Sequence, residues 1–217
     1  MDKLISDKIV EYIKVNRVSS TEVSDCLNKS GVIKDVFPVN DSKFCVGIIH
    51  WTYGVDETNW YIHKSIEDLT KDHVVVISSF NCSERSLIGS LIAKFILLYK
   101  QSVGVVVIGK IRDVPFYKKE GWPVWCLGYN PVGCFNDYRD NSKHIITIEK
   151  EREFYHNSIA VCDDTGVVII PKEEHTLEFL DKLAKIEERE DQWSYSINKL
   201  KKSTFETICT EDQGFEL

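Results

Sequence analysis

Apolar residues in the middle of the chain come in short runs that are separated by turn-forming or charged residues. Several of these runs are rich in valine and isoleucine, a composition typical of buried strands. They cover residues 44–50, 73–79, 105–108, 124–127 and, with an alternating pattern, 144–148. Two more runs, 158–161 and 167–170, flank an Asp-Asp-Thr-Gly segment that favours a hairpin turn. The central part of the chain is therefore predicted to form a sheet.

Other segments space their apolar residues close to the helical period of 3.6. They cover residues 2–16, 21–27 (with Ser19 or Ser20 as N-cap), 59–69 and about 173–202. The segment 86–99 is apolar almost all round, with Lys94 as its only charge, which predicts a buried helix. Helices and strands mixed in this order, ending in a hairpin and a long helix, predict a single α/β domain. A frayed tail is expected from residue 204 to the end.

The composition narrows the class of protein. The chain has 217 residues, of which 43% are hydrophobic and 28% charged, as in an ordinary globular domain. The net charge of −7 gives no electrostatic reason to bind nucleic acid. The first residues lack an apolar signal-peptide core and no run reaches transmembrane length, so we expect a cytoplasmic protein that binds no membrane. The seven scattered cysteines contain no Cys-x-x-Cys and predict reduced thiols rather than a zinc site.

Charged residues follow the strand predicted at 105–108. Arg112 and Asp113 stand where this strand should leave the core, and Pro115 begins a short helix that ends at Gly121. Ligands of open α/β sheets bind beyond the carboxyl ends of the strands. The pair could therefore hold an anion with the arginine and a metal or proton with the aspartate, although a surface ion pair fits the pattern equally well. Gly89 suggests a close approach of the backbone, either to a packed neighbour or to a ligand at free helix amides.

Six short motifs recur in a recognisable order. They are Gly89-Ser90-Leu91-Ile92-Ala93, residues 104–109, Arg112-Asp113, residues 121–125, Pro131-Val132-Gly133 and residues 163–171. Over residues 18–203 this order resembles the RraA-like family, which includes class II pyruvate aldolases, oxaloacetate decarboxylase-like enzymes and inhibitors of ribonuclease E. The resemblance implies an α/β/β/α domain similar to the swivelling phosphohistidine domain. It would comprise an N-terminal helix (1–17), the RraA-like domain (18–172), a C-terminal helix on its own or a neighbouring subunit (173–203) and a tail (204–217).

The resemblance also implies a function. The expected activity is that of a metal-dependent lyase, which forms pyruvate from a 2-oxo acid by retro-aldol cleavage or decarboxylation through a metal- and arginine-stabilised enolate. Arg112 would stabilise the enolate and Asp113 would hold Mg²⁺ or Mn²⁺. The backbone amides of Gly89, Ser90, Leu91 and Ile92 would bind the pyruvyl carboxylate. The family implies a homotrimer or hexamer with sites between subunits, in which a late glutamate, Glu190 or else Glu188, reaches the neighbouring metal.

Departures from the aldolase pattern keep two alternatives open. Ser90 and Ile108 occupy positions where the aldolases have acidic residues. This fits a non-catalytic regulatory protein that resembles the ribonuclease E inhibitor, or a specialised enzyme with another substrate. The aromatic segments alone suggest a diverged enzyme that acts on a sugar acid. The aromatic segments 50–53 and 59–61 could line a sugar pocket, but packing in the core or at a subunit interface is favoured.

Overall fold

The computed structural model describes residues 4–209. The strands are β1 (Phe37–Pro38), β2 (Cys45–Val55), β3 (Val74–Phe80), β4 (Ser86–Ile88), β5 (Gly104–Ile111), β6 (Val124–Tyr129), β7 (Ile159–Cys162) and β8 (Val167–Ile170). The α-helices are α1 (Ile5–Asn16), α2 (Ser20–Cys26), α3 (Trp60–Ser65), α4 (Ser90–Lys94), α5 (Val114–Glu120), α6 (Ile145–Tyr155) and α7 (Leu177–Asn198). Short helical turns are η1 (Phe95–Tyr99), η2 (Ser142–His144), η3 (Lys172–Glu174) and η4 (Phe205–Cys209).

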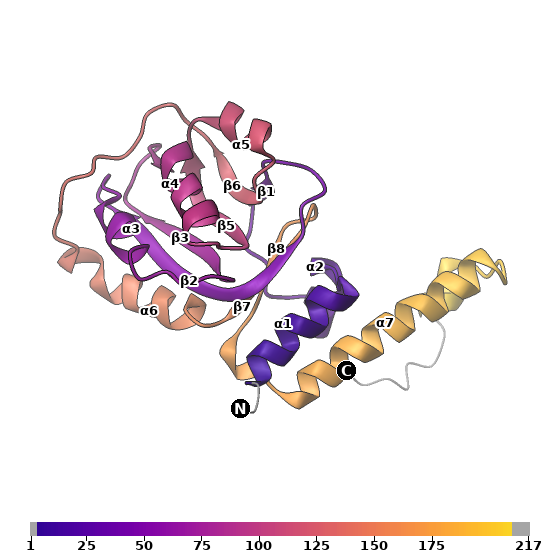
Figure 1. Ribbon diagram of the computed structural model, residues 1–217. Coiled ribbons are helices and arrows are strands. Elements are labelled where there is room, and N and C mark those ends of the chain that lie inside the picture. The colour runs from indigo at the N-terminus through magenta and orange to yellow at the C-terminus, as the bar shows by residue number, and fades with distance from the viewer. Residues whose placement is uncertain (1–3, 210–217) are drawn as a thin grey trace.

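The strands form a sheet in the order β1-β6-β5-β3-β2-β7-β8, with β4 beside the end of β5. Strands β2 to β6 pair in parallel with one another, whereas β1 pairs antiparallel with β6, and β7 pairs antiparallel with both β2 and β8. The long strand β2 connects the two parts, because its first residues pair with β7 and residues Ile49–Val55 pair with β3. In Figure 1, β2 is the long curved arrow that runs between these parts.

The alternation of side chains along the strands creates three apolar layers. One face of β3 and β5 packs with α3 and η1 through residues such as Ile77, Val107 and Ile96. Their other face shares a second cluster with the hairpin, to which Val76 and Ala160 both belong. The outer face of the hairpin packs against α1, α2 and α7. The layer order is thus helix, strand, strand, helix, which confirms the predicted α/β/β/α fold with a long C-terminal helix.

Two predictions of local structure are wrong. Residues 144–148 begin helix α6 and do not form a strand. The alternating pattern there suggested a strand, but Ile148 is buried in the second cluster and Tyr155 of the same helix packs against it, so this tertiary packing outweighs strand propensity. Residues 86–99 are not a single buried helix. Ser86–Ile88 is the strand β4, and the helix begins after its N-cap Gly89.

The helical part of that segment is also less buried than its composition suggested. Ala93 and Ile96 are buried, but Leu91 is 80% exposed and Tyr99 is 70% exposed. The helix packs against only one face of the sheet, so its outer side remains uncovered in the single chain. The exposed apolar side chains of α4, η1 and α5 form one face, which we call the α4–α5 face. Its residues are Leu91, Phe95, Leu98, Tyr99 and Phe116.

Helix α7 divides into two halves. Thr176 caps its first turn by accepting a hydrogen bond from the amide of Phe179, and the first half buries Phe179, Leu183 and Ile186 in the third cluster. The second half has no buried residue; it passes α2 at Glu190, and its last turns extend away from the rest of the molecule, as Figure 1 shows in yellow-orange. Of the tail predicted to be frayed, 205–209 is a helical turn, and 210–217 lies outside the described residues. Among residues 4–209, none of the helices combines the length and apolar character that crossing a membrane requires.

Candidate active site

The charged corner lies where the sequence placed it, directly after β5. Asp113 has a φ of 66°, a left-handed conformation that aspartate tolerates better than most residues. Although Asp113 is the N-cap of α5, its side chain does not cap that helix. Its Oδ2 atom instead accepts hydrogen bonds from the Ser90 amide at 2.9 Å and the Ser90 hydroxyl at 3.1 Å. Ser90 therefore holds the Asp113 carboxylate against the start of α4.

Two glycines give the Arg112 side chain its space. A Cβ atom at Gly133 would lie 2.6 Å from Nη1 of Arg112, and one at Gly89 would lie 3.1 Å from its Nε and 2.5 Å from Oδ2 of Asp113. Both distances to the arginine are shorter than ordinary van der Waals contact. A side chain at 133, and to a smaller extent one at 89, would push the guanidinium out of this position.

A cavity of about 400 Å³ opens in front of this corner. Of the residues predicted for the site, Gly89, Leu91, Ile92, Arg112 and Asp113 line it, and Ser90 adjoins it through Asp113. The structure thus brings together two segments that are separated in sequence by η1 and β5. Ile108, in contrast, packs with the second cluster, which belongs to the opposite face of the sheet.

The cavity also contains polar residues that the sequence did not single out. Asn59 is the N-cap of α3 and His63 lies in its last turn, whereas Cys134 and Asn136 come from the loop after β6. Asn59 and His63 are four residues apart, a spacing that places two side chains on one helix face. That spacing was visible in the sequence, but nothing in the sequence indicated that this face of α3 meets the carboxyl end of β5.

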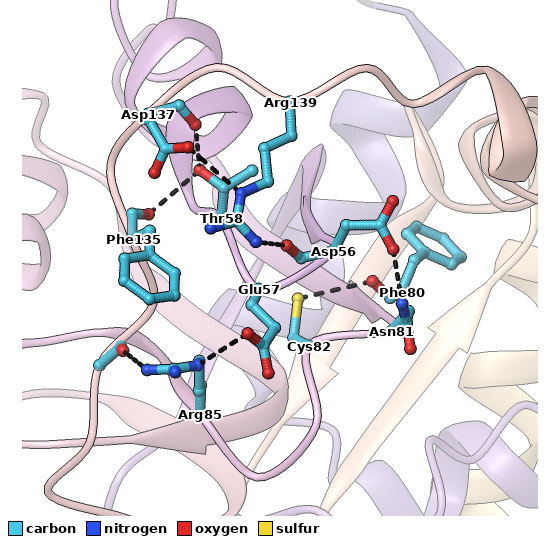
Figure 2. Close-up of polar contacts among 11 residues, drawn as sticks. Asp56, Glu57, Thr58, Phe80, Asn81, Cys82, Arg85, Phe135, Asp137 and Arg139 are labelled. Carbon is cyan, nitrogen blue, oxygen red and sulfur yellow. Dashed lines mark hydrogen bonds and ion pairs between the residues drawn. The ribbon is translucent and has the colours of Figure 1, made fainter.

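The loop after β6 forms one wall of the cavity, and hydrogen bonds link this loop to the turn between β2 and α3, as Figure 2 shows. The buried Thr58 hydroxyl donates to the carbonyls of Phe135, at 3.1 Å, and Asp137, at 2.6 Å. The Arg139 guanidinium donates to the Asp56 carbonyl. Arg85 pairs with Glu57 and donates to the Gly133 carbonyl. These contacts hold the loop beside the cavity and keep Gly133 in place beneath Arg112.

Burial affects two groups next to the cavity. The Tyr117 hydroxyl is fully buried and has no hydrogen-bond partner within the described residues, and burial followed by the Asp113 charge raises the pKa of Tyr117. On the opposite wall, a hydrogen bond with Cys134 lowers the pKa of the buried Cys82 thiol to about 7. Both groups lie behind the surface of the site, whereas Arg112, Asp113 and His63 are exposed at it.

Glu190, the predicted partner of the metal, does not lie in this cavity. It is on the second half of α7, near Glu22, Asp25 and Arg189, and burial followed by the charges of Glu22 and Asp25 raises its pKa. Within residues 4–209, no group of three or more His, Cys, Asp or Glu residues is placed to hold a metal. The approach of Glu190 to a neighbouring subunit therefore stays a prediction.

A second cavity, of about 360 Å³, lies between β2, α3 and α6. The aromatic segment at 50–53 lines it, although most of its rings pack with one another: Tyr53 stacks on Tyr61 at 4.9 Å and on Trp51 at 5.3 Å. The sequence favoured packing for these rings, and the structure agrees. His50 is partly buried here, 5.9 Å from the ring of His156. Burial, followed by the charge of His156, lowers the pKa of His50 from 6.5 to about 4.

This shift predicts that acid weakens the fold through His50. Between pH 6.5 and about 4 the unfolded chain binds a proton that folded His50 does not, so stability falls as the pH drops through this window. The loss is about 1 to 3 kcal/mol after allowance for the solvent-facing part of the ring. Urea unfolding of wild type and His50→Gln at pH 7 and pH 4.5 checks this. The variant should lose less stability, and equal losses would contradict the assignment.

Comparison with known proteins agrees with this architecture. The model of the RraA-like family, described as Aldolase/RraA, matches residues 20–169, and the chain belongs to this family. A Pseudomonas syringae protein of uncharacterised function superposes with a TM-score of 0.69 at 16% identity, covering 94% of this chain and 98% of that one. Streptomyces coelicolor RraAS2, described as an unusual member of the RNase ES inhibitor RraA family, gives 0.65 at 19% identity, covering 83% and 94%.

A curated relative is more similar in sequence but much longer. Protein DlpA of Legionella pneumophila is 25% identical over 164 residues, which is 71% of this chain. The chain spans about a quarter, 26%, of the length of that relative. The family is thus established, and the activity has to be argued from the site itself.

Proposed function

We propose that this protein is a lyase of the RraA-like family that cleaves or decarboxylates a 2-oxo acid to give pyruvate. The observation that carries the proposal is the position of the Arg112 guanidinium. It lies between Gly89 and Gly133 at the edge of the cavity, and within the described residues it forms no hydrogen bond or ion pair. A planar guanidinium offers paired donors that match a carboxylate or an enolate. Arg112 would bind the keto-acid oxygens and stabilise the negative charge that develops on them.

The start of α4 would hold the carboxylate of the same substrate. Amides in the first turn of a helix lack partners within the helix, and Leu91 and Ile92 line the cavity. The amide of Ser90 donates its hydrogen bond to Asp113. It is therefore not available to bind the substrate carboxylate, which the sequence had suggested as its role. In this proposal Leu91 and Ile92 bind the carboxylate, and Ser90 orients Asp113.

Asp113 suits a weakly held divalent cation. Oδ2 of its carboxylate accepts the bonds from Ser90, and Oδ1 has no hydrogen bond among the described residues. Mg²⁺ commonly binds through one or two carboxylates together with substrate oxygens and water, so a single carboxylate is compatible with it. When bound, Mg²⁺ or Mn²⁺ would supply Lewis-acid polarisation of the keto group. The proposed contribution of Asp113 is to hold the cation beside Arg112, with Glu190 from a neighbouring subunit as a second ligand.

The same arrangement supports self-association of the chain. The α4–α5 face, with Leu91, Phe95, Leu98, Tyr99 and Phe116, is exposed in the single chain and adjoins the cavity at Leu91. Exposed apolar patches of this kind mark interaction sites. We propose that a second copy covers this face in a homotrimer or hexamer and that the projecting half of α7 reaches a neighbour.

Pyruvate release tests the activity directly. Oxaloacetate and 4-hydroxy-4-methyl-2-oxoglutarate are assayed with Mg²⁺ or Mn²⁺ and again with a chelator. We expect metal-dependent release that Asp113→Asn lowers by roughly 100-fold or more. Asp72→Asn is the matched control, because Asp72 is exposed, also has a left-handed φ of 65° and lies outside the cavity. A folded protein that releases no pyruvate from either compound would contradict the proposal and favour a regulatory role.

A further inference from the structure

Two cysteines from different segments meet at one wall of the first cavity. Cys134, in the loop after β6, is partly buried and lines the cavity together with Arg112. Cys82, in the turn between β3 and β4, is only 1% exposed. Both side chains pack in the first apolar cluster, and their thiols share a hydrogen bond. One thiol of the pair therefore faces the cavity, and the other lies behind it.

Backbone hydrogen bonds hold both segments of this pair in place. The amide of Cys134 donates to the Ser86 carbonyl at 3.0 Å. The turn that begins at Cys82 ends at Arg85, whose amide donates to the Cys82 carbonyl at 3.1 Å. The guanidinium of Arg85 donates to the Gly133 carbonyl at 3.0 Å, next to Cys134 in the chain. Figure 2 shows Cys82 within this group of contacts. The fold itself therefore keeps the two thiols next to each other.

The shared hydrogen bond makes one proton of the pair easy to remove. It lowers the pKa of Cys82 to about 7, and it raises the pKa of Cys134, which donates to the Cys82 thiolate and so keeps its proton. The ionised pair thus carries one negative charge and shares one proton. When that proton moves from Cys134 to Cys82, the thiolate faces the cavity, where the charge of Arg85 favours it. The thiolate is the form of cysteine that reacts with oxidants.

We propose that Cys134 and Cys82 are a site of oxidation by hydrogen peroxide, at which Cys134 reacts from the cavity and Cys82 completes a disulfide behind it. The Cys134 thiolate forms a bond to one peroxide oxygen, the O–O bond breaks, and the hydroxide that leaves takes the proton of Cys82 to become water. The Cys82 thiolate then attacks the sulfenic sulfur of Cys134 and displaces hydroxide, which takes a proton from the solvent. The two thiols lose two electrons, and one peroxide becomes two waters.

Other cysteines of the described chain provide internal controls. Cys45 and Cys162 lie opposite each other on β2 and β7, but both are buried in the second cluster and neither lines the cavity. They control for contact between thiols without access. Cys209 on η4 is exposed and controls for access alone. The proposed oxidation needs only the thiols and peroxide, so it does not depend on the reaction proposed for the cavity.

Oxidation of the native chain tests this proposal. Reduced wild type is treated with a modest excess of hydrogen peroxide at neutral pH, free thiols are alkylated, and the peptides are mapped by mass spectrometry. We expect a disulfide between Cys82 and Cys134 that dithiothreitol reverses and that forms about tenfold faster than one between Cys45 and Cys162. In Cys82→Ser, dimedone should trap a sulfenic acid at Cys134. In Cys134→Ser, Cys82 should stay reduced, because peroxide has lost the thiol that faces the cavity.

Three results would overturn the proposal. The first is a wild-type chain in which Cys209 is oxidised while Cys82 and Cys134 stay reduced. The second is equal formation of the two disulfides, which would show that access from the cavity has no influence. The third is oxidation of Cys82 in Cys134→Ser, which would assign the first step to the wrong thiol. If a serine variant does not fold, alanine replaces the serine, and the peptide map of wild type already decides whether the disulfide forms.

Discussion

Replacing Arg112 with glutamine is expected to lower kcat/KM for pyruvate formation by roughly 10²- to 10³-fold, the usual effect of removing one preorganised donor from a developing oxyanion. Glutamine keeps one amide donor but loses the charge and the paired geometry of the guanidinium. The side chain is exposed and makes no hydrogen bond or ion pair among the described residues, so its loss should leave the fold intact.

The measurement combines steady-state kinetics with thermal unfolding. A large fall in kcat/KM with a melting temperature close to that of wild type would place Arg112 in the reaction. Lys110→Gln is the control on the same strand, because Lys110 pairs with Glu84 and does not line the cavity. Unchanged turnover in Arg112→Gln would exclude the arginine as the group that stabilises the enolate.

The second large effect is expected from Gly133→Ala, which adds one methyl group. The new Cβ would lie 2.6 Å from Nη1 and 2.8 Å from Cζ of Arg112, too close for both groups to keep their positions. The atoms that it meets are at the end of a flexible side chain, so the guanidinium moves and the backbone does not. Displacing a catalytic group by about 1 Å can cost about 100-fold in rate, so activity should fall by that order while stability changes by less than about 1 kcal/mol.

A double-mutant cycle checks the mechanism of this loss. If Gly133→Ala acts by displacing the guanidinium, it should cause almost no further loss of activity in the Arg112→Gln background. Additive losses would show that the alanine disturbs something else, such as the hydrogen bond from Arg85 to the Gly133 carbonyl. Urea unfolding of both single variants provides the stability control.

The predictions from sequence succeeded where neighbouring residues decide the outcome. The strand predicted at 105–108, which lies within β5, and the short helix closed by Gly121 both depend on local propensity and turn chemistry. For the same reason the hairpin at Ile159–Ile170 was found from its turn residues. Local patterns failed at α6 and β4, where a packing contact and a pairing with β5 outweigh the intrinsic preference of the residues.

The amino-acid sequence by itself determined the family, the α/β class and the Arg112-Asp113 corner, because each of these depends on residue types in a fixed order along the chain. Only the tertiary structure decided what meets that corner. Asn59 and His63 reach it because the parallel pairing of β2, β3 and β5 brings the ends of separate strands to one edge of the sheet. Likewise, Cys82 and Cys134 meet only because the loop after β6 folds back onto the start of β4, where the Cys134 amide donates to the Ser86 carbonyl.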